Sequence, residues 1–535
     1  MRSGTRFLST AVILLSGLIL AILMFGGIWL YRSTPVSRSI LRANSIEEVI
    51  QITLSPTSID SISAEIEIVA PIIQSRWTRS LLSIVVPSVV LNDLEFLLEN
   101  EKVLIGLLRE FHYTVGSKEQ SRVRVLLQND MEIRPTGGFL GSYADLVFDQ
   151  GVLVDVIVQD IYEPDGQVVG YIKPPEPVEQ YLFQSGGWKL RDANWDPDFA
   201  RSAEAIDWFF QKAEYPEAEM MLGITLGLME EIFEILAPVY LPDYGLELDA
   251  EQMYVFIQRE TEHEFFPGAT NKRDVISAVA RAMIRQFSEL DTSEKLRIMT
   301  IVLDGVQSRE LQAWSPIETS QQNLELLGVN GGFFSNLCQT DTFCLSDYIY
   351  LVEANLGINK TNCCIERHVS IRYKFEDSGE VSRRLSIQYN NKNPKTPNPP
   401  KQYGGGYLNY LRLYTNNAWI CKSVTIQDQS STPNRGCNSI GSIEASLQER
   451  SFSLLIEGGE NGEIVVEEVL PFHWKNLNTF AVGLQRQSGT RTNTYVIELD
   501  HPSEYQFSIQ DEQYLHPVTI DLLKPTTLTF TYQTR

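Results

Sequence analysis

Residues 122–162 read RVRVLLQNDMEIRPTGGFLGSYADLVFDQGVLVDVIVQDIY, and this stretch decides the expected fold. The segment RVRVLLQ (122–128) has the composition of a β-strand. GFLGSYADLVF (138–148) and VLVDVIVQDIY (152–162) flank the turn Asp149-Gln150-Gly151, and this arrangement predicts a β-hairpin. A strand, a glycine-containing loop and a hairpin therefore open the central domain.

Helices and one further strand follow the hairpin and define the class of this domain. Asp196-Pro197-Asp198 predicts a helix start, with Asp196 as N-cap and Pro197 at the first helical position. MLGITLG (221–227) is a predicted strand, and helices are predicted at about 226–237, 249–258, 271–288 and 293–306. Because strands and helices intermix, residues 119–335 are expected to form an α+β or α/β core domain.

Residues 336–535 change to a β pattern. Short strands separated by turn residues recur, among them DYIYLVEANL (347–356), CIERHVSIRYKF (364–375), RRLSIQYNN (383–391) and TLTFTYQ (527–533). This spacing is typical of an antiparallel β-sandwich, which we expect for the C-terminal region.

On the N-terminal side, residues 43–118 have a helical pattern. Their apolar residues recur at helical spacing along one face: Leu94, Leu97, Leu98, Leu104, Leu107, Leu108 and Phe111. Pro56, Pro71 and Pro87 exclude one continuous coiled coil. A membrane-proximal helical stalk and a helical layer packed on the next domain both fit this pattern.

Residues 1–42 are expected to hold a cytoplasmic tip and a transmembrane anchor. Phe7–Tyr31 is an uncharged run of 25 residues, long enough for a bilayer core of about 30 Å. A cleaved signal peptide is the alternative, but its apolar stretch is normally about 7–15 residues long. We therefore expect a single-pass anchor with a cytoplasmic N-terminus and most of the chain outside the cell.

All six cysteines lie within about a hundred residues of the C-terminal region: Cys338, Cys344, Cys363, Cys364, Cys421 and Cys437. An even, clustered set behind an anchor predicts disulfides in an oxidising compartment. The short loop Cys338-QTDTF-Cys344 suggests one specific pair, whereas the other pairings stay open. Buried free thiols are the alternative, and no zinc-site spacing is present.

Charge and missing motifs exclude several classes of function. The chain has 68 acidic and 44 basic residues, a net charge of −24, so phosphate backbones would repel it and nucleic acid is not an expected partner. The sequence lacks G-x-x-x-x-G-K-[ST], H-E-x-x-H, G-x-S-x-G and G-x-G-x-x-G motifs. No standard cofactor is therefore indicated.

The stretch from Gln128 to Phe139, with the Gly-Ser-Tyr strand that follows, resembles the signature of the bacterial and archaeal family called domain of unknown function 4012. Three later segments also resemble that family: DANWDPDFARSAE (192–204), EANLGINKTN (353–362) and YLRLYT (410–415). The resemblance implies membership of a membrane-anchored family and no particular activity.

The strand, arginine-containing loop and hairpin are also remotely similar to the LytR-CpsA-Psr glycopolymer transferases. This resemblance implies that Arg134 binds a pyrophosphate, while Asp160 and Asp192 do base work or bind Mg²⁺. Apart from the resemblance, Asp160, Glu163 and Asp165 at the strand end could supply oxygens to Mg²⁺ or Ca²⁺. The candidate substrate-binding residues are Asn129, Thr136, Gly137, Gly138, Arg191 and Trp195. The backbone N–H groups of the two glycines could approach a phosphate, and Trp195 could stack on a sugar ring. The implied function is to act on or bind an envelope glycopolymer or its polyprenyl-pyrophosphate carrier.

Each of these residues also has a structural interpretation. Arg134 is equally suited to pair with Glu132 or a hairpin carboxylate, while the glycines allow a tight turn. Asp160 and Asp165 follow a strand, where acidic residues commonly form solvated turns, and Trp195 is a typical core residue. The alternative function is accordingly a non-catalytic cell-surface scaffold or adhesion protein.

Overall fold

The computed structural model describes residues 63, 79–80, 83, 86–116, 118–182, 186–253, 255–256, 271–334, 337, 344–396, 404–416, 418–428, 437, 439–444, 447–471, 473–491, 493–510 and 512–535. The expected anchor, Phe7–Tyr31, lies outside these residues. Among the residues that are described, no helix is both long and apolar enough to cross a membrane.

The chain divides into two compact units. The smaller unit includes helices α6 (Ser88–Glu99) and α7 (Glu101–Gly116), the hairpin turn at 148–153 and residues 284–300. Within it, Arg297 donates a hydrogen bond of 2.7 Å to Asp93 of α6, and Phe111 of α7 packs edge-on against Phe148 at a ring distance of 5.7 Å. The predicted apolar face of these helices is thus used at least partly for packing.

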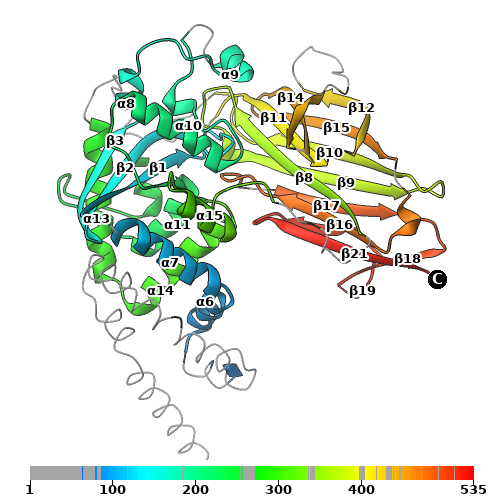
Figure 1. Ribbon diagram of the computed structural model, residues 1–535, viewed down its shortest axis with the longest axis horizontal. Helices are drawn as coiled ribbons and strands as arrows, with labels where there is room; N and C mark the ends of the chain where they lie inside the picture. The colour runs from blue at the N-terminus through cyan, green and yellow to red at the C-terminus, as the bar shows by residue number, and fades with distance from the viewer. Residues whose placement is uncertain are drawn as a thin grey trace, which may run out of the picture. The chain divides into compact units, whose positions relative to one another are not determined.

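The larger unit comprises residues 121–147, 154–283 and 301–535, so it joins the α/β core to the β-rich region. The core sheet has the order β3-β2-β1-β4-β7 (Figure 1). Its strands are β1 (Gln120–Asn129), β2 (Phe139–Asp149), β3 (Val152–Asp160), β4 (Met220–Thr225) and β7 (Leu311–Trp314). β4 runs parallel to β1, with Val123 beside Met220, and β7 runs antiparallel to β4. The expected strand and hairpin are confirmed.

Four helices begin within a few residues of their predicted starts: α10 (Phe199–Lys212), α11 (Leu226–Leu236), α13 (Asn271–Glu289) and α14 (Thr292–Gln307). The sequence did not predict α8 (Tyr162–Gln167), α9 (Glu176–Tyr181), α15 (Glu318–Leu326) or the short strands β5 (Val239–Leu241) and β6 (Leu246–Leu248). The helix predicted at 249–258 lies partly outside the described residues.

The predicted N-cap of α10 is wrong by two residues. Asp198 caps α10 by accepting from the Ala200 N–H at 2.9 Å, whereas Asp196 accepts from the Asp198 N–H in the preceding turn. The proline lies in that turn, and the helix starts at Phe199.

The β-rich region contains a six-stranded sheet of order β12-β15-β10-β9-β17-β20 and an eight-stranded sheet of order β13-β14-β11-β8-β16-β21-β18-β19. The strands are β8 (Cys344–Asn355), β9 (Ile365–Phe375), β10 (Val381–Asn391), β11 (Tyr407–Asn416), β12 (Ile420–Gln427), β13 (Ser439–Glu444), β14 (Leu447–Ile456), β15 (Asn461–Leu470), β16 (Thr479–Gln485), β17 (Asn493–Asp500), β18 (Tyr505–Ile509), β19 (Glu512–Gln513), β20 (Val518–Asp521) and β21 (Thr526–Thr534). Short 3₁₀ turns lie at Leu190–Asp192, Asn362–Cys364 and Trp474–Asn476.

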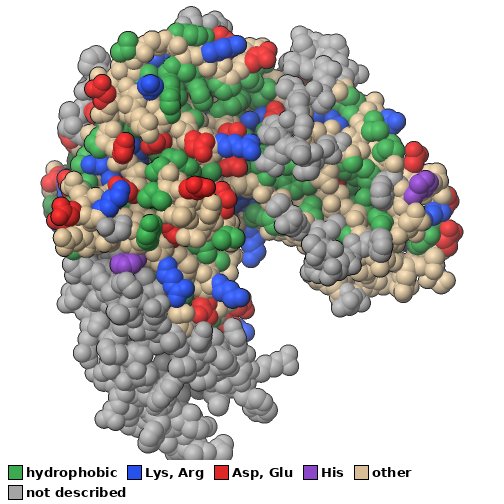
Figure 2. Space-filling model, in the orientation of Figure 1, with side chains coloured by type: hydrophobic (Ala, Val, Ile, Leu, Met, Phe, Trp, Pro, Cys, Tyr) green, Lys and Arg blue, Asp and Glu red, His purple; other side chains and the backbone are tan. Residues whose placement is uncertain are grey.

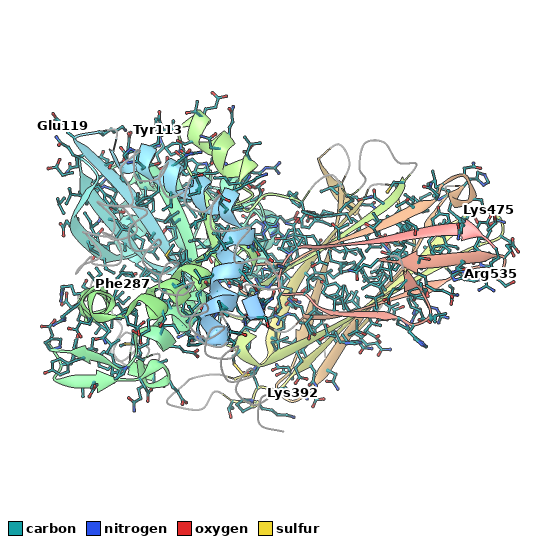
Figure 3. All side chains as sticks on the ribbon, turned by 90° about the horizontal axis from the view of Figure 1, so that it is seen from below. Tyr113, Glu119, Phe287, Lys392, Lys475 and Arg535 are labelled. Atoms are coloured by element: carbon teal, nitrogen blue, oxygen red, sulfur yellow. A yellow bond between two sulfur atoms is a disulfide. The ribbon has the colours of Figure 1, made fainter. Side chains whose placement is uncertain are left out.

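Both sheets contribute to one apolar core, in which aromatic residues such as Tyr373, Phe375 and Phe480 pack against each other, and Figure 3 shows side chains filling the space between the sheets. The expectation of purely antiparallel sheets is wrong, because β16 pairs in parallel with β8 and β17 in parallel with β9. A parallel pair requires a long crossover, which the strands between β9 and β16 supply. The described chain is thus a mixed α+β structure.

Candidate functional site

The signature loop, which we define as residues 128–139, leaves the end of β1 in a tight turn. The Gly137 N–H donates to the Arg134 carbonyl at 2.9 Å, and the Phe139 N–H donates to the Glu132 carbonyl at 3.0 Å. A Cβ atom on Gly138 would overlap the backbone of Asn129, and Gly137 has a φ of +142°. Only glycine fits both conditions, so the glycine pair lets the chain fold back on itself.

Arg134 lies inside this turn and is 2% exposed. Its guanidinium donates to Glu132 at 2.8 Å, to Asp192 at 3.4 Å and to the Asn355 carbonyl oxygen at 2.7 Å. Burial raises the pKa of Asp192, while Arg134 and Arg191 oppose that rise. The arginine is thus held by two carboxylates and by a backbone carbonyl of the β-rich region.

Two more cations lie at the edge of this cluster. Arg191 donates to Asp165 at 2.5 Å and lies 3.8 Å from Asp192, and its side chain is 22% exposed. Burial lowers the pKa of Lys360 to about 8, and the neighbouring Glu132 opposes that shift. Arg191 thus adjoins Asp192, and Lys360 adjoins Glu132, on two sides of the buried Arg134.

The other residues predicted for a site are engaged in local structure. Asp160 accepts from the Tyr162 N–H at 3.0 Å, and Asn129 accepts from the Met131 N–H at 3.1 Å. Thr136 donates to the Gln128 side chain at 2.6 Å. Trp195 packs on Tyr410 at a ring distance of 5.8 Å.

Asp160 and Asp165, the predicted metal ligands, both contact protein groups. Asp165 accepts from the Leu190 N–H at 2.8 Å in addition to its pair with Arg191, so its oxygens are already occupied. Among the described residues, no group of three or more His, Cys, Asp or Glu side chains is arranged to hold a metal ion. A magnesium site at Asp160 and Asp165 stays a prediction.

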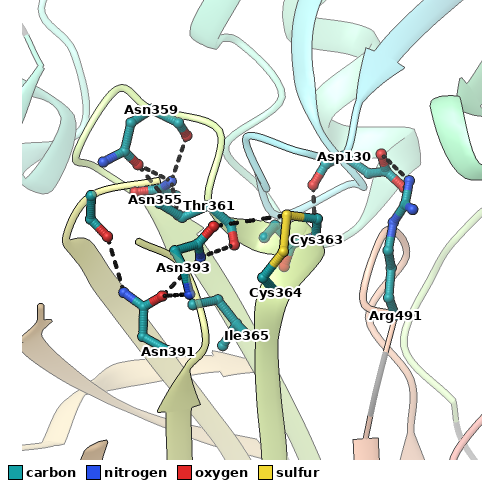
Figure 4. The surroundings of a disulfide bond; sticks show 12 residues. Asp130, Asn355, Asn359, Thr361, Cys363, Cys364, Ile365, Asn391, Asn393 and Arg491 are labelled. Atoms are coloured by element: carbon teal, nitrogen blue, oxygen red, sulfur yellow. Dashed lines mark hydrogen bonds and ion pairs between the residues drawn. A yellow bond between two sulfur atoms is a disulfide. The ribbon is translucent and has the colours of Figure 1, made fainter. Parts of the chain in front are cut away.

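The β-rich region docks on the signature loop, and we call this contact the joint. Its residues Gln487 and Arg491 were not singled out in the sequence, whereas Asn362 ends one of the segments that resemble the family. The Asn362 side chain donates to the carbonyl oxygens of Asp130 at 2.6 Å and Gly489 at 2.8 Å. Gln487 donates to the Arg134 carbonyl oxygen at 3.1 Å. Arg491 lies 3.3 Å from Asp130 (Figure 4).

The four sequence segments that resemble the family meet at this joint. Arg134 of the first contacts Asp192 of the second and the Asn355 carbonyl of the third, and Arg412 of the fourth donates to the Trp195 carbonyl at 2.7 Å. The order of the segments along the chain was visible in the sequence. Their convergence was not, because it depends on pairs of residues far apart in the chain.

The cysteines of the described chain are all in disulfides. Cys421 pairs with Cys437, and the adjacent Cys363 and Cys364 are joined to each other beside the joint (Figure 4). Cys344 is also disulfide-bonded, while Cys338 lies outside the described residues. The expectation of disulfides is supported, and the suggested Cys338–Cys344 pair stays a prediction.

Comparisons with known proteins agree with the resemblance. The profile of the family described as "Protein of unknown function (DUF4012)" matches residues 118–261. A search of curated proteins found no match. Solved structures that are similar include a protein from Listeria innocua, with 10% identity and a TM-score of 0.23 over 40% of this chain and 78% of that one.

Two further solved structures match with similarly low identity and TM-score. A transcriptional regulator from Enterococcus faecalis has 10% identity and a TM-score of 0.24 over 41% of this chain and 74% of that chain. An M1 zinc metallopeptidase from Deinococcus radiodurans has 12% identity and a TM-score of 0.16, with 32% of this chain and 39% of that chain covered. Scores this low carry no argument about fold or function.

Proposed function

Taking residues 118–261 as a domain of the DUF4012 family, we propose that the protein is a non-catalytic cell-surface scaffold whose signature loop fastens the core to the β-rich region. One observation carries the proposal. Arg134, the cation on which a pyrophosphate site would depend, is 2% exposed, and both terminal nitrogens of its guanidinium donate to protein groups. A guanidinium fork that is already occupied has little left to offer a phosphate.

Further observations support a scaffold. The signature glycines are explained by close packing, since a Cβ on Gly137 would lie 2.8 Å from Ser488 Oγ of the β-rich region. On the face shown in Figure 2, acidic and basic side chains of the described residues are interspersed, which suits solvation rather than one anionic ligand. A scaffold needs a fixed arrangement of its parts, and the joint supplies it.

The proposal includes a place in the cell. We infer that Phe7–Tyr31 anchors the chain in the membrane and that the body lies outside, because the Cys421–Cys437 disulfide suits an oxidising compartment. Protease added to intact cells should then degrade the body. Complete protection of the body would contradict this orientation.

A second candidate function is the binding of a lipid-linked glycan or its polyprenyl-pyrophosphate carrier. It is favoured by the cations beside Arg134: Arg191 adjoins Asp192, Lys360 adjoins Glu132, and both are only partly buried. On this view the carrier would meet Arg191 and Lys360 first.

The two candidates are separated by one experiment on the full-length protein in detergent. Thermal midpoints and binding of a short-chain polyprenyl pyrophosphate are measured for the wild type, Arg134→Ala and Arg191→Ala. A scaffold predicts no binding by the wild type and a large loss of midpoint in Arg134→Ala alone. Micromolar binding that Arg191→Ala removes without a change of midpoint would establish the second candidate instead.

A further inference from the structure

Residues 486–491, which we call the clasp loop, connect β16 to β17 and reach from the β-rich region to the ends of β1 and β4. The Gly489 N–H donates to Glu310 at 3.2–3.3 Å, just before β7, and its carbonyl accepts from Asn362. A Cβ atom on Gly489 would overlap the Gly137 carbonyl oxygen of the signature loop. The carboxyl ends of parallel strands commonly form a ligand crevice, and here the clasp loop occupies that position.

Charged groups hold the clasp loop in place. Arg491 lies 3.3 Å from Asp130 and 3.1 Å from Glu230 of α11, and Arg486 pairs with Glu310. Two guanidinium groups thus face three carboxylates at this end of the sheet. Asp130 is 2% exposed, whereas the side chains of Glu230 and Arg491 are about one-third exposed. The excess negative charge is therefore most costly at Asp130.

The clasp loop is largely buried, but two of its side-chain groups lack a hydrogen-bond partner among the described residues. Ser488 Oγ and Arg491 Nε are buried and have no hydrogen-bond partner among the described residues. Both groups would recover hydrogen bonds to water if the loop lifted, which reduces the cost of lifting. This geometry suits a contact with two states, docked and open.

From this arrangement we propose that the clasp loop is a pH-dependent latch, which docks more tightly when Asp130 takes up a proton. Protonation leaves Glu230 and Glu310 against Arg491 and Arg486, so the charges of the docked state balance. The proposal goes beyond the scaffold function, since it makes the joint adjustable. It also stands independently of any ligand.

Docking of the clasp loop and binding of a proton to Asp130 are linked, and this linkage gives the direction and the pH range of the effect. Burial raises the pKa of Asp130 to about 7, with Glu310 and Glu230 adding to the rise and Arg491 opposing it. Lifting the loop admits water and returns this pKa toward about 3.9. The docked state therefore binds the proton more tightly, and docking strengthens as the pH falls from about 7 toward about 4, by up to about tenfold per pH unit. Above pH 7 both states are ionised and the effect levels off.

The test is amide hydrogen exchange of residues 486–491 in the full-length protein between pH 5 and pH 8, corrected for the intrinsic rate. We expect protection of these amides in the wild type to rise by up to about a hundredfold from pH 7 to pH 5. Asp130→Asn keeps the shape of the side chain but cannot ionise, and should remove the dependence. Asp243→Asn, in an exposed ion pair with Arg281, is the matched control and should keep it.

Two results would overturn the proposal: protection of the clasp loop that is independent of pH in the wild type, or an equal dependence in the wild type and Asp130→Asn. Arg491→Gln keeps the test decisive if Asp130→Asn does not fold. Because this variant removes the cation that favours ionised Asp130, the dependence should remain and move to higher pH. A dependence that stays in the same pH range as in the wild type would contradict the latch.

Discussion

Two buried arginines serve two regions of this molecule in different ways. Arg134 at the joint is 2% exposed and pairs with Glu132, Asp192 and a backbone carbonyl. Arg383 inside the β-sandwich is fully buried between Asp347 and Glu468, and its guanidinium lies 4.4 Å from the centre of the Trp419 ring. The first connects two parts of the chain, and the second connects the two sheets of one part.

The comparison teaches that a buried arginine among carboxylates is not by itself evidence for a ligand. Arg383 has such surroundings, although it comes from the middle of strand β10 and no loop motif accompanies it. Arg134 attracts attention because a proline and two glycines follow it, yet its contacts are of the same kind. The following predictions test how far the two sites are alike.

The largest effect is expected for Arg383→Ala. Removing the guanidinium leaves Asp347 buried without its cation and should lower the free energy of unfolding by about 5 kcal/mol. Arg383→Met fills the same space with an apolar side chain but still leaves the Asp347 carboxylate without a cation. The double variant with Asp347→Asn removes that buried charge and should lose less free energy of unfolding than Arg383→Met alone. Denaturant titration of the two variants measures this, and equal losses would show that the buried charge of Asp347 is not the cause.

Arg134→Ala should cost somewhat less, about 3 kcal/mol, because Glu132 is closer to solvent and keeps Lys360 nearby. Arg134→Lys keeps the charge but loses the planar fork that reaches Glu132 and the Asn355 carbonyl together. We therefore expect this variant to lose stability, but less than Arg134→Ala does. Chemical unfolding monitored by tryptophan fluorescence provides the values. A loss below 1 kcal/mol for Ala would mean that Arg134 is not structural.

Gly138→Ala tests the joint without changing any charge. The added methyl group would overlap the Asn129 backbone, so the turn must shift, at a cost of about 2 kcal/mol. Gly166→Ala is the matched control, since a Cβ there meets no atom within 4 Å. Thermal midpoints of the two variants should differ clearly, and equal midpoints would remove the packing explanation for the signature glycine.

The smallest effect is expected for Arg384→Ala, beside Arg383 on the same strand. Its side chain is 55% exposed and pairs with Glu467, also largely exposed, across the sheet surface. Exposed pairs contribute below about 1 kcal/mol, and salt screens them. Unfolding in low and high salt checks this, because a large loss here would show that burial does not explain the cost at Arg383.

Local patterns in the sequence predicted much of the fold. The period-two alternation of residues 122–128 and the turn at Asp149-Gln150-Gly151 depend on neighbouring residues, and β1 and the hairpin formed as expected. The pairing of Arg134 with Glu132, two residues away, was also an open alternative. Each of these features is decided within a few residues of chain.

The rest of the fold and of the candidate site depends on contacts between residues that are distant in the sequence. The Asn355 carbonyl is 221 residues from Arg134, and Arg491 is 361 residues from Asp130. No single-sequence pattern encodes such a pair. Strand alternation places Arg383 on the face of Leu385 and Ile387, but its partners Asp347 and Glu468 come from distant strands. The parallel pairing of β16 with β8 was hidden for the same reason.

The place of β16 and β17 in the two sheets has a consequence for how the chain is made. β16 lies between β8 and β21, and β17 lies between β9 and β20, so strands from the last sixty residues stand inside both sheets. During synthesis, β8 and β9 emerge long before these partners and must wait with one edge unpaired. Such edges promote aggregation, and contacts of long sequence separation form slowly. The β-rich region can therefore complete its folding only after β16 and β17 have left the ribosome.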